Sequence, residues 1–133
     1  MLRIAIVLAA SVALMATPAL AKSLSRTIPA NKTSVLMPII GVDMTNCTIY
    51  QARDAKITTQ PSNGMAAIVE KTLPLPPDYA QCKGKVVKVK LLAYQPKGRF
   101  VGLDHVGVSY TMPSNTGENS QVYNAFDIEV TVK

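Results

Sequence analysis

Apolar and polar residues alternate with a period of two over long stretches of this chain. In the C-terminal segment Phe126 to Lys133, four apolar residues alternate with four polar ones, beginning with Phe126 and Asp127. Successive side chains of an extended strand point to opposite faces. This segment therefore predicts a strand with one face on a core and the other in water.

Six further segments predict strands by the same pattern or by shorter runs of strand-forming residues between turn residues. In Lys88 to Tyr94, the residues Val89, Leu91 and Ala93 are predicted to share one core face with Val87, and Lys88 and Lys90 to form the wet face. The full set is Ser34 to Met37, Asn46 to Gln51, Ala55 to Thr59, Met65 to Lys71, Lys88 to Tyr94, His105 to Met112 and Phe126 to Lys133. About seven strands predict an all-β fold, an antiparallel sandwich of two sheets.

No stretch after residue 21 has apolar residues at a sustained helical spacing. The long connection Lys71 to Gln81 contains Pro74, Pro76 and Pro77, so it predicts an extended loop or one short helical turn. A second connection, Pro113 to Gln121, is rich in Ser, Asn and Gly and predicts a flexible hairpin loop. These two loops are the candidate protruding binding elements.

The N-terminal segment has the features of a cleavable signal peptide, residues 1–21. A basic start at Arg3 precedes an apolar run, and Ala19 and Ala21 provide the small residues that signal peptidase requires. The apolar run is shorter than the roughly 20 residues that span a bilayer. We therefore expect an exported protein, periplasmic or secreted to the cell surface, with no membrane span after cleavage. Residues 22–133 are then a single domain.

Cys47 and Cys82 are the two cysteines of the chain. In an oxidising compartment two cysteines of a small domain are expected to form a disulfide. A redox-active pair normally requires the Cys-x-x-Cys spacing, which is absent. One histidine and two distant cysteines do not build a zinc site, and we expect neither a metal nor a cofactor.

The charge of the chain is basic, with 14 Lys and Arg against 8 Asp and Glu. The one cluster, Lys83, Lys85, Lys88 and Lys90, is interpreted mainly as the solvated face of a strand. A weak binding surface for an acidic polysaccharide or membrane is the alternative. Nucleic-acid binding is not expected, because no aromatic or Arg residues are interleaved with these lysines.

The order of motifs resembles the immunoglobulin-like or cadherin-like β-sandwich modules of bacterial surface and secreted proteins. The resemblance lies in a Pro-x-x-Gly turn ending at Gly64, then Tyr94-Gln95-Pro96, the segment Phe100-Val101-Gly102-Leu103-Asp104, a strand through Tyr110 and a Val-rich last strand. It implies an immunoglobulin-like fold, here as a single exported domain.

Elementary physical chemistry assigns structural roles to the same residues. Phe100 and Tyr110 are predicted to fill the core between the sheets. Gly102 permits a backbone geometry that a side chain would forbid. Asp104 is predicted to cap a turn by accepting backbone N–H hydrogen bonds.

No catalytic set is recognisable in the sequence, so we do not expect an enzyme. His105 is the only histidine and is predicted to lie on the polar face of its strand. Asp127 and Glu129 share one strand face, but their context is that of an ordinary wet face. No Gly-x-Ser-x-Gly motif occurs.

Three functions therefore stay open. The favoured one is a non-enzymatic binding module whose partner is another envelope or surface protein, or a glycan. The second is an accessory structural subunit of an envelope or extracellular assembly, bound through an exposed strand edge. The third is a small inhibitor of an envelope enzyme.

Overall fold

The computed structural model of the protein describes residues 21–114 and 120–133. The predicted signal peptide lies outside these residues except for Ala21, and the predicted Pro113 to Gln121 loop lies outside them at positions 115–119. No helix among the described residues is long and apolar enough to cross a membrane.

The described chain forms eight strands and one 3-10 helix. In chain order these are β1 (Lys22–Ile28), β2 (Ser34–Asp43), β3 (Thr48–Gln51), β4 (Arg53–Thr59), β5 (Gly64–Pro74), η1 (Pro77–Cys82), β6 (Val86–Pro96), β7 (Gly102–Pro113) and β8 (Gln121–Val132). All seven predicted strands are present. The fold is therefore the predicted all-β class.

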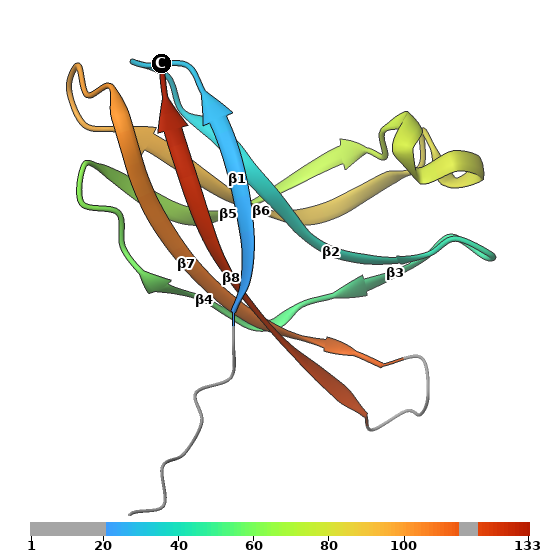
Figure 1. The fold of residues 1–133 in the computed structure, drawn as a ribbon. Helices are drawn as coiled ribbons and strands as arrows, with labels where there is room; N and C mark the ends of the chain where they lie inside the picture. Colours follow the sequence, from blue (N-terminus) through green and yellow to red (C-terminus); the bar gives the residue numbers. More distant parts are fainter. Residues whose placement is uncertain (1–20, 115–119) are drawn as a thin grey trace, which may run out of the picture.

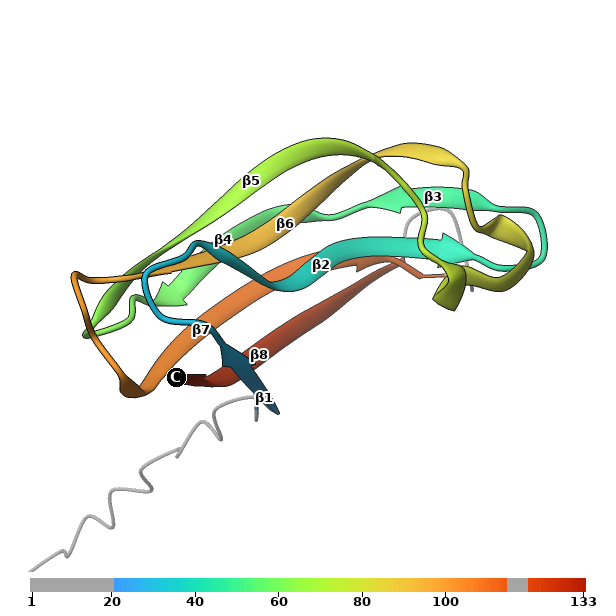
Figure 2. The same ribbon diagram turned by 90° about the horizontal axis from the view of Figure 1, so that it is seen from above.

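The strands form two sheets of four, in the orders β1-β8-β7-β4 and β3-β2-β6-β5. The two sheets pack as the layers of a sandwich (Figures 1 and 2). Strands β2, β6 and β5 have the order of strands B, E and D of an immunoglobulin domain, and β4, β7 and β8 have that of C, F and G. The topology is compatible with an immunoglobulin-like sandwich.

Strand β1 was not predicted, and it makes the fold only partly antiparallel. It pairs in parallel with the C-terminal strand β8, from Lys22 opposite Phe126 to Ile28 opposite Val132. Its sequence contains only two strongly apolar residues, Leu24 and Ile28, in seven positions. Such a strand carries a weak periodic signal and is held by its neighbour rather than by its own pattern.

The main core lies between the sheets and is built from the predicted alternating strands. Its fully or almost fully buried members include Leu36, Ile39, Leu92, Tyr94, Val106, Val108, Ile128, Val130 and Val132. The expected faces of β7 and β8 are confirmed in their central parts, where Val106, Val108, Ile128 and Val130 are buried and His105, Asp127 and Glu129 are exposed. Ser109, predicted on the polar face of β7, is buried instead.

The predicted faces of β6 are wrong in part. Leu92 and Tyr94 lie on the same strand face as Lys88 and Lys90. Leu92 and Tyr94 are fully buried in the main core. Val87, Val89 and Leu91 are also buried, but on the opposite, outer face of the sheet. Strand β6 is therefore apolar on both faces, which the adjacent residues Leu91 and Leu92 conceal from a period-two analysis.

Strand β2 changes partner along its length. It pairs with β6 only as far as Ile39, opposite Lys90, and with β3 from Ile40 onward. Proline has no backbone N–H and so cannot donate to a neighbouring strand. Pro38 is tolerated in this central strand because β3 pairs with β2 only from Ile40 onward, so no β3 residue needs that N–H. Beyond Ile39 the β2–β3 hairpin separates from β6 (Figure 1).

Candidate functional site

A buried carboxylate links several segments at the end of the sandwich where β4 and β6 end and β7 begins. The Asp104 side chain is 3% exposed and accepts hydrogen bonds from the backbone N–H groups of Ser62 (3.0 Å), Asn63 (2.9 Å) and His105 (2.9 Å). The Tyr94 hydroxyl donates a fourth, at 2.8 Å. Asp104 thus binds the backbone of the turn that ends at Gly64, far from it in the chain.

The electrostatics of this pair follow from the same contacts. Burial raises the pKa of Asp104, but the hydrogen bonds from Tyr94 and the three amides outweigh burial, so that pKa lies below its ordinary value. Burial, and then the neighbouring Asp104, raise the pKa of Tyr94. The pair is ionised carboxylate and neutral phenol at neutral pH. Two of the four donors, the Ser62 and Asn63 amides, belong to the turn.

Close packing explains the glycine at position 64. A Cβ there would lie 2.6 Å from the Gln95 carbonyl oxygen and 2.6 Å from Cζ of Tyr94. Gly102 has φ +138°, which favours glycine, and a Cβ would approach the Phe100 ring at 3.3 Å.

The two predicted aromatic core residues are also placed. Tyr110 is buried in the main core, and Phe100 packs against that core while half-buried. Tyr110 stacks on Phe126 at 6.0 Å between ring centroids. Both residues thus contribute to packing between the sheets.

The predicted disulfide Cys47–Cys82 is formed. It joins the tip of the β2–β3 hairpin to η1, across the gap where β2 leaves β6. The Gln81 side chain adds a hydrogen bond to the Met44 carbonyl. Residues 75–85, the β5–β6 connection, are closed by backbone hydrogen bonds between Leu75 and both Gly84 and Lys85.

The prediction for Lys71 to Gln81 is confirmed for the short helical turn and wrong for a protruding loop. Its first four residues belong to strand β5, and η1 supplies the short helical turn. Leu75, Cys82 and Val87 form a second buried cluster under this connection. It covers one end of the sheet instead of protruding as a free loop.

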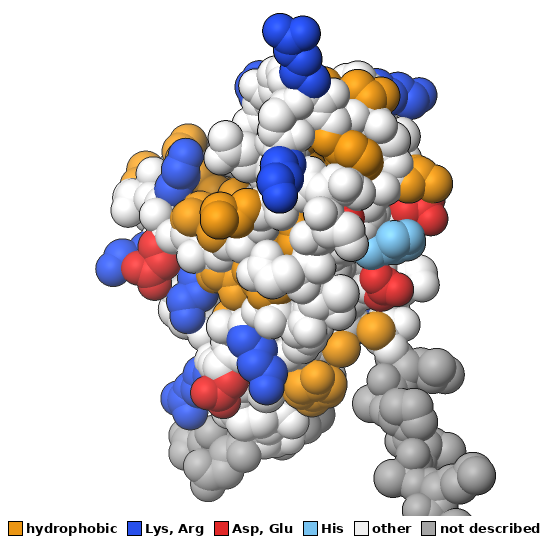
Figure 3. All heavy atoms as spheres, turned by 90° about the vertical axis from the view of Figure 1, so that its left-hand side faces the viewer, with side chains coloured by type: hydrophobic (Ala, Val, Ile, Leu, Met, Phe, Trp, Pro, Cys, Tyr) orange, Lys and Arg blue, Asp and Glu red, His pale blue; other side chains and the backbone are white. Residues whose placement is uncertain are grey.

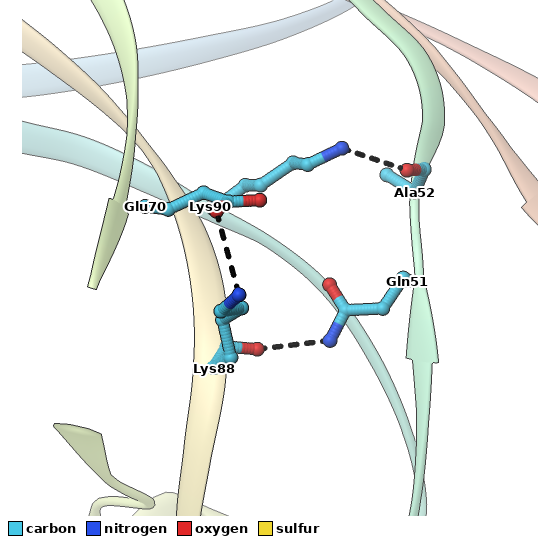
Figure 4. A network of polar contacts seen from close by, with 5 residues as sticks. All are labelled: Gln51, Ala52, Glu70, Lys88 and Lys90. Carbon is cyan, nitrogen blue, oxygen red and sulfur yellow. Dashed lines mark hydrogen bonds and ion pairs between the residues drawn. The ribbon is translucent and has the colours of Figure 1, made fainter. Parts of the chain in front are cut away.

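Three of the four clustered lysines contact other protein groups. Lys88 Nζ lies 3.9 Å from Glu70 Oε2, and Lys90 Nζ donates to the Ala52 carbonyl at 3.1 Å (Figure 4). Lys85 Nζ donates to the Cys47 carbonyl at 2.7 Å. Lys83 is exposed after η1. Binding of an acidic ligand by these lysines stays a prediction.

Gln51 completes the polar network of Figure 4. Its side-chain amide donates to the Lys88 carbonyl at 2.9 Å. Lys88 lies on the part of β6 that no longer pairs with β2. The glutamine thus supplies a hydrogen bond that β2 does not provide there.

The outer face of the β3-β2-β6-β5 sheet is apolar, and we call it the outer sheet face. It consists of Val35, Pro38, Met65, Ala67, Val69, Leu73, Val89 and Leu91. A hollow of about 260 Å³ lies on it, lined only by apolar, proline and tyrosine side chains. A smaller hollow of about 140 Å³ continues it towards Met65 and Gln95. Met65 is 72% exposed and Val35 51%.

The opposite outer face, on the β1-β8-β7-β4 sheet, is polar. By register it presents Ser23, Ser25, Thr27, His105, Thr111, Asp127, Glu129 and Thr131. Its exposed apolar side chains, Leu103 and Tyr123, stand at its two ends. His105 Nδ1 lies 3.9 Å from Asp127 Oδ1, and both side chains are more than half exposed. The sandwich therefore has one apolar and one polar outer face.

Charged and apolar groups also mix on the molecular surface seen from the left of Figure 1. Hydrophobic side chains are visible there between Lys and Arg side chains (Figure 3).

Among the described residues no group of three or more His, Cys, Asp or Glu could hold a metal ion.

Sequence reasoning missed the outer sheet face, although a signal for it exists. Residues Val86 to Ala93 are apolar except for two lysines, which is more than one buried face requires.

The comparisons with known proteins add no family to this description. Neither a protein-family model, nor a curated protein, nor a solved structure matches the chain.

Proposed function

We propose that this chain is an exported, non-enzymatic interaction module with an immunoglobulin-like or cadherin-like sandwich. Its outer sheet face binds another protein of the bacterial envelope or surface. Export is inferred from the signal-peptide pattern of residues 1–21, and the disulfide Cys47–Cys82 is consistent with an oxidising compartment.

The apolar outer sheet face is the observation that carries the proposal. Large exposed apolar patches on a domain indicate interaction sites. This face joins exposed Val35, Met65 and Leu73 to an apolar hollow, whereas the other sheet has a polar outer face. The contrast supports a surface adapted to a partner.

A non-catalytic role has separate support. The buried pair Tyr94 and Asp104 has shifted pKa values, which can indicate an active site. Here the carboxylate accepts four hydrogen bonds, two of them from the turn amides of Ser62 and Asn63, so the shifts have a structural cause.

An accessory structural subunit is the second candidate. Strand β5 is an edge of its sheet and pairs with β6 over all 11 residues, which leaves an equally long free edge. Such edges accept a strand from a partner. An inhibitor has less support, because the connection expected to protrude is clamped by Cys47–Cys82.

A glycan is the second candidate ligand. A hollow of about 520 Å³ on the polar side is lined by Asp54, Lys56, Ser109 and Tyr123 among others, and Tyr123 is 57% exposed. Sugars stack on exposed aromatic rings, and polar groups bind their hydroxyls. A glycan array that compares the wild type with Tyr123→Ala tests this candidate.

A site-directed photocrosslinking experiment tests the main proposal. A photoreactive amino acid is placed at Val35 on the outer sheet face, and at Glu129 on the polar outer face as the matched control. We expect one stoichiometric envelope partner to be crosslinked from position 35 and not from position 129. Equal capture from both positions, or none from either, would contradict the proposal.

A further inference from the structure

Strand β5 is an unusually regular exposed edge. All residues from Gly64 to Pro74 pair with β6 without a bulge, and no strand among residues 21–114 and 120–133 pairs with the other side of β5. Edge strands are normally protected by bulges, by charged side chains, by Pro or by short length, and of these β5 carries Glu70, Lys71 and the terminal Pro74. Here Met65, Ala67 and Leu73 are exposed along the edge, and the lone Lys71 is the only charge on their face.

The apolar residues of β5 are placed symmetrically about the middle of the strand. Val69 is the central residue of Gly64–Pro74, with five residues on either side. Met65 and Leu73, the exposed large apolar residues of β5, each lie four positions from it. An antiparallel two-fold pair centred on Val69 thus places Met65 of one copy opposite Leu73 of the other.

We propose that the β5 edge binds a second copy of this chain in that register. A two-fold interface is self-complementary, and the whole strand is paired only when the axis passes through Val69. The two sheets then join into one continuous sheet of twice four strands. The two outer sheet faces become one surface.

The charges of β5 agree with this register. Lys71 lies opposite Ala67 of the other copy, and Glu70 lies opposite Ile68. An axis through Glu70 or Lys71 would instead place like charges directly opposite each other, which is destabilising. Glu70 is also partly neutralised by its own Lys88 at 3.9 Å.

This inference deepens the proposed function, since the paired molecule presents a doubled apolar face to the partner. It differs from that function in its site, because self-pairing uses the backbone edge of β5. Partner binding uses the side chains of the outer sheet face.

Engineered cysteines test the register. Opposite Cα atoms of an antiparallel pair are about 4.5–5.5 Å apart, within the range that a disulfide spans. Both native cysteines are paired with each other, so Val69→Cys introduces the only free thiol. We expect V69C to form a disulfide-linked dimer under mild oxidation.

Ala67→Cys is the matched control on the same face. In the proposed register the Cα atoms of position 67 in the two copies are separated by four residues, about 13 Å along the strand. We expect A67C alone to stay unlinked and the double variant A67C/K71C to crosslink. Crosslinking of A67C as fast as V69C would overturn the register.

Sedimentation equilibrium on unoxidised protein tests the association itself. We expect a concentration-dependent dimer in the wild type and in Val69→Thr, and at least about tenfold weaker association in Val69→Lys, because two lysines would then face each other. A wild-type monomer at every concentration overturns self-pairing.

The two proposals fail separately. If the protein is monomeric but position 35 still captures an envelope partner, self-pairing is wrong and the proposed function stands. If the dimer forms and position 35 captures nothing, partner binding by the outer sheet face is wrong and self-pairing stands.

Discussion

Replacing Asp104 by Asn tests whether the buried carboxylate organises the end of the sandwich. The substitution keeps the shape of the side chain but replaces one carboxylate oxygen by an NH₂ group, which cannot accept a hydrogen bond. Each oxygen accepts two hydrogen bonds, Oδ1 from Ser62 and His105, and Oδ2 from Asn63 and Tyr94. Two donors therefore lose their acceptor in D104N.

The magnitude follows from the number of lost bonds. A hydrogen bond to a charged group contributes about 1.5–3 kcal/mol, so we expect the loss of two in D104N to lower the free energy of unfolding by about 3–6 kcal/mol. Tyr94→Phe removes one of the four bonds and leaves the carboxylate with three. We expect it to cost about 2 kcal/mol. In a double-mutant cycle the two changes should be strongly non-additive.

Urea unfolding followed by circular dichroism and by tyrosine fluorescence measures both changes, since the chain has five tyrosines and no tryptophan. D104N should shift the midpoint without changing the slope m. A loss below about 1 kcal/mol for D104N, or a larger loss for Y94F than for D104N, would refute the reasoning.

The same site predicts the pH dependence of stability. The pKa of Asp104 is lower in the folded than in the unfolded chain, so its contribution is complete above about pH 4 and is lost as the pH falls further. The pKa of Tyr94 is raised on folding, so its contribution is lost as the pH rises above about 10. D104N should remove much of the acid slope. Asp43, whose pKa is lowered by the Thr45 hydroxyl, acts in the same acid window, so D43N is the comparison.

Three further variants test the packing. Gly64→Ala should cost about 2–4 kcal/mol in urea unfolding, because a Cβ would overlap Tyr94 and the Gln95 carbonyl; a neutral result would show that the turn relaxes freely. Cys47→Ser combined with Cys82→Ser should cost about 4 kcal/mol, the loop entropy for a separation of 35 residues, and unchanged stability would contradict a structural role for the bond. Ser109→Ala should raise the unfolding free energy by about 1 kcal/mol, because the Ser109 hydroxyl is buried without a hydrogen-bond partner; a loss of similar size would indicate an unseen partner.

Local sequence was sufficient for the elements that carry their own signal. Phe126 to Val132 alternates cleanly because one of its faces is wet, and the structure buries the apolar face as expected. Asp104 is different, because it accepts a local N–H from His105 but also those of Ser62 and Asn63, which lie 42 and 41 residues away in the chain. The pairing of Cys47 with Cys82 required only that there were two cysteines.

The candidate interaction surface could not be derived in this way. The apolar residues of β6 indicated burial, but not which of two sheet faces they would line. That depends on β2 leaving β6 after Ile39 and on the connection that follows Leu75. The free edge of β5 likewise exists only because no other strand pairs with it.

The sequence by itself determined the fold class, the seven predicted strands and the disulfide, because the strands depend on local patterns and the disulfide on the presence of two cysteines. Tertiary structure alone decided that β1 joins β8 in parallel, that β6 is buried on both faces, and that one outer face is apolar and the other polar. Those features depend on which strands become neighbours. Pairing between segments far apart in the chain is set by the sum of many long-range contacts, and no local pattern encodes it.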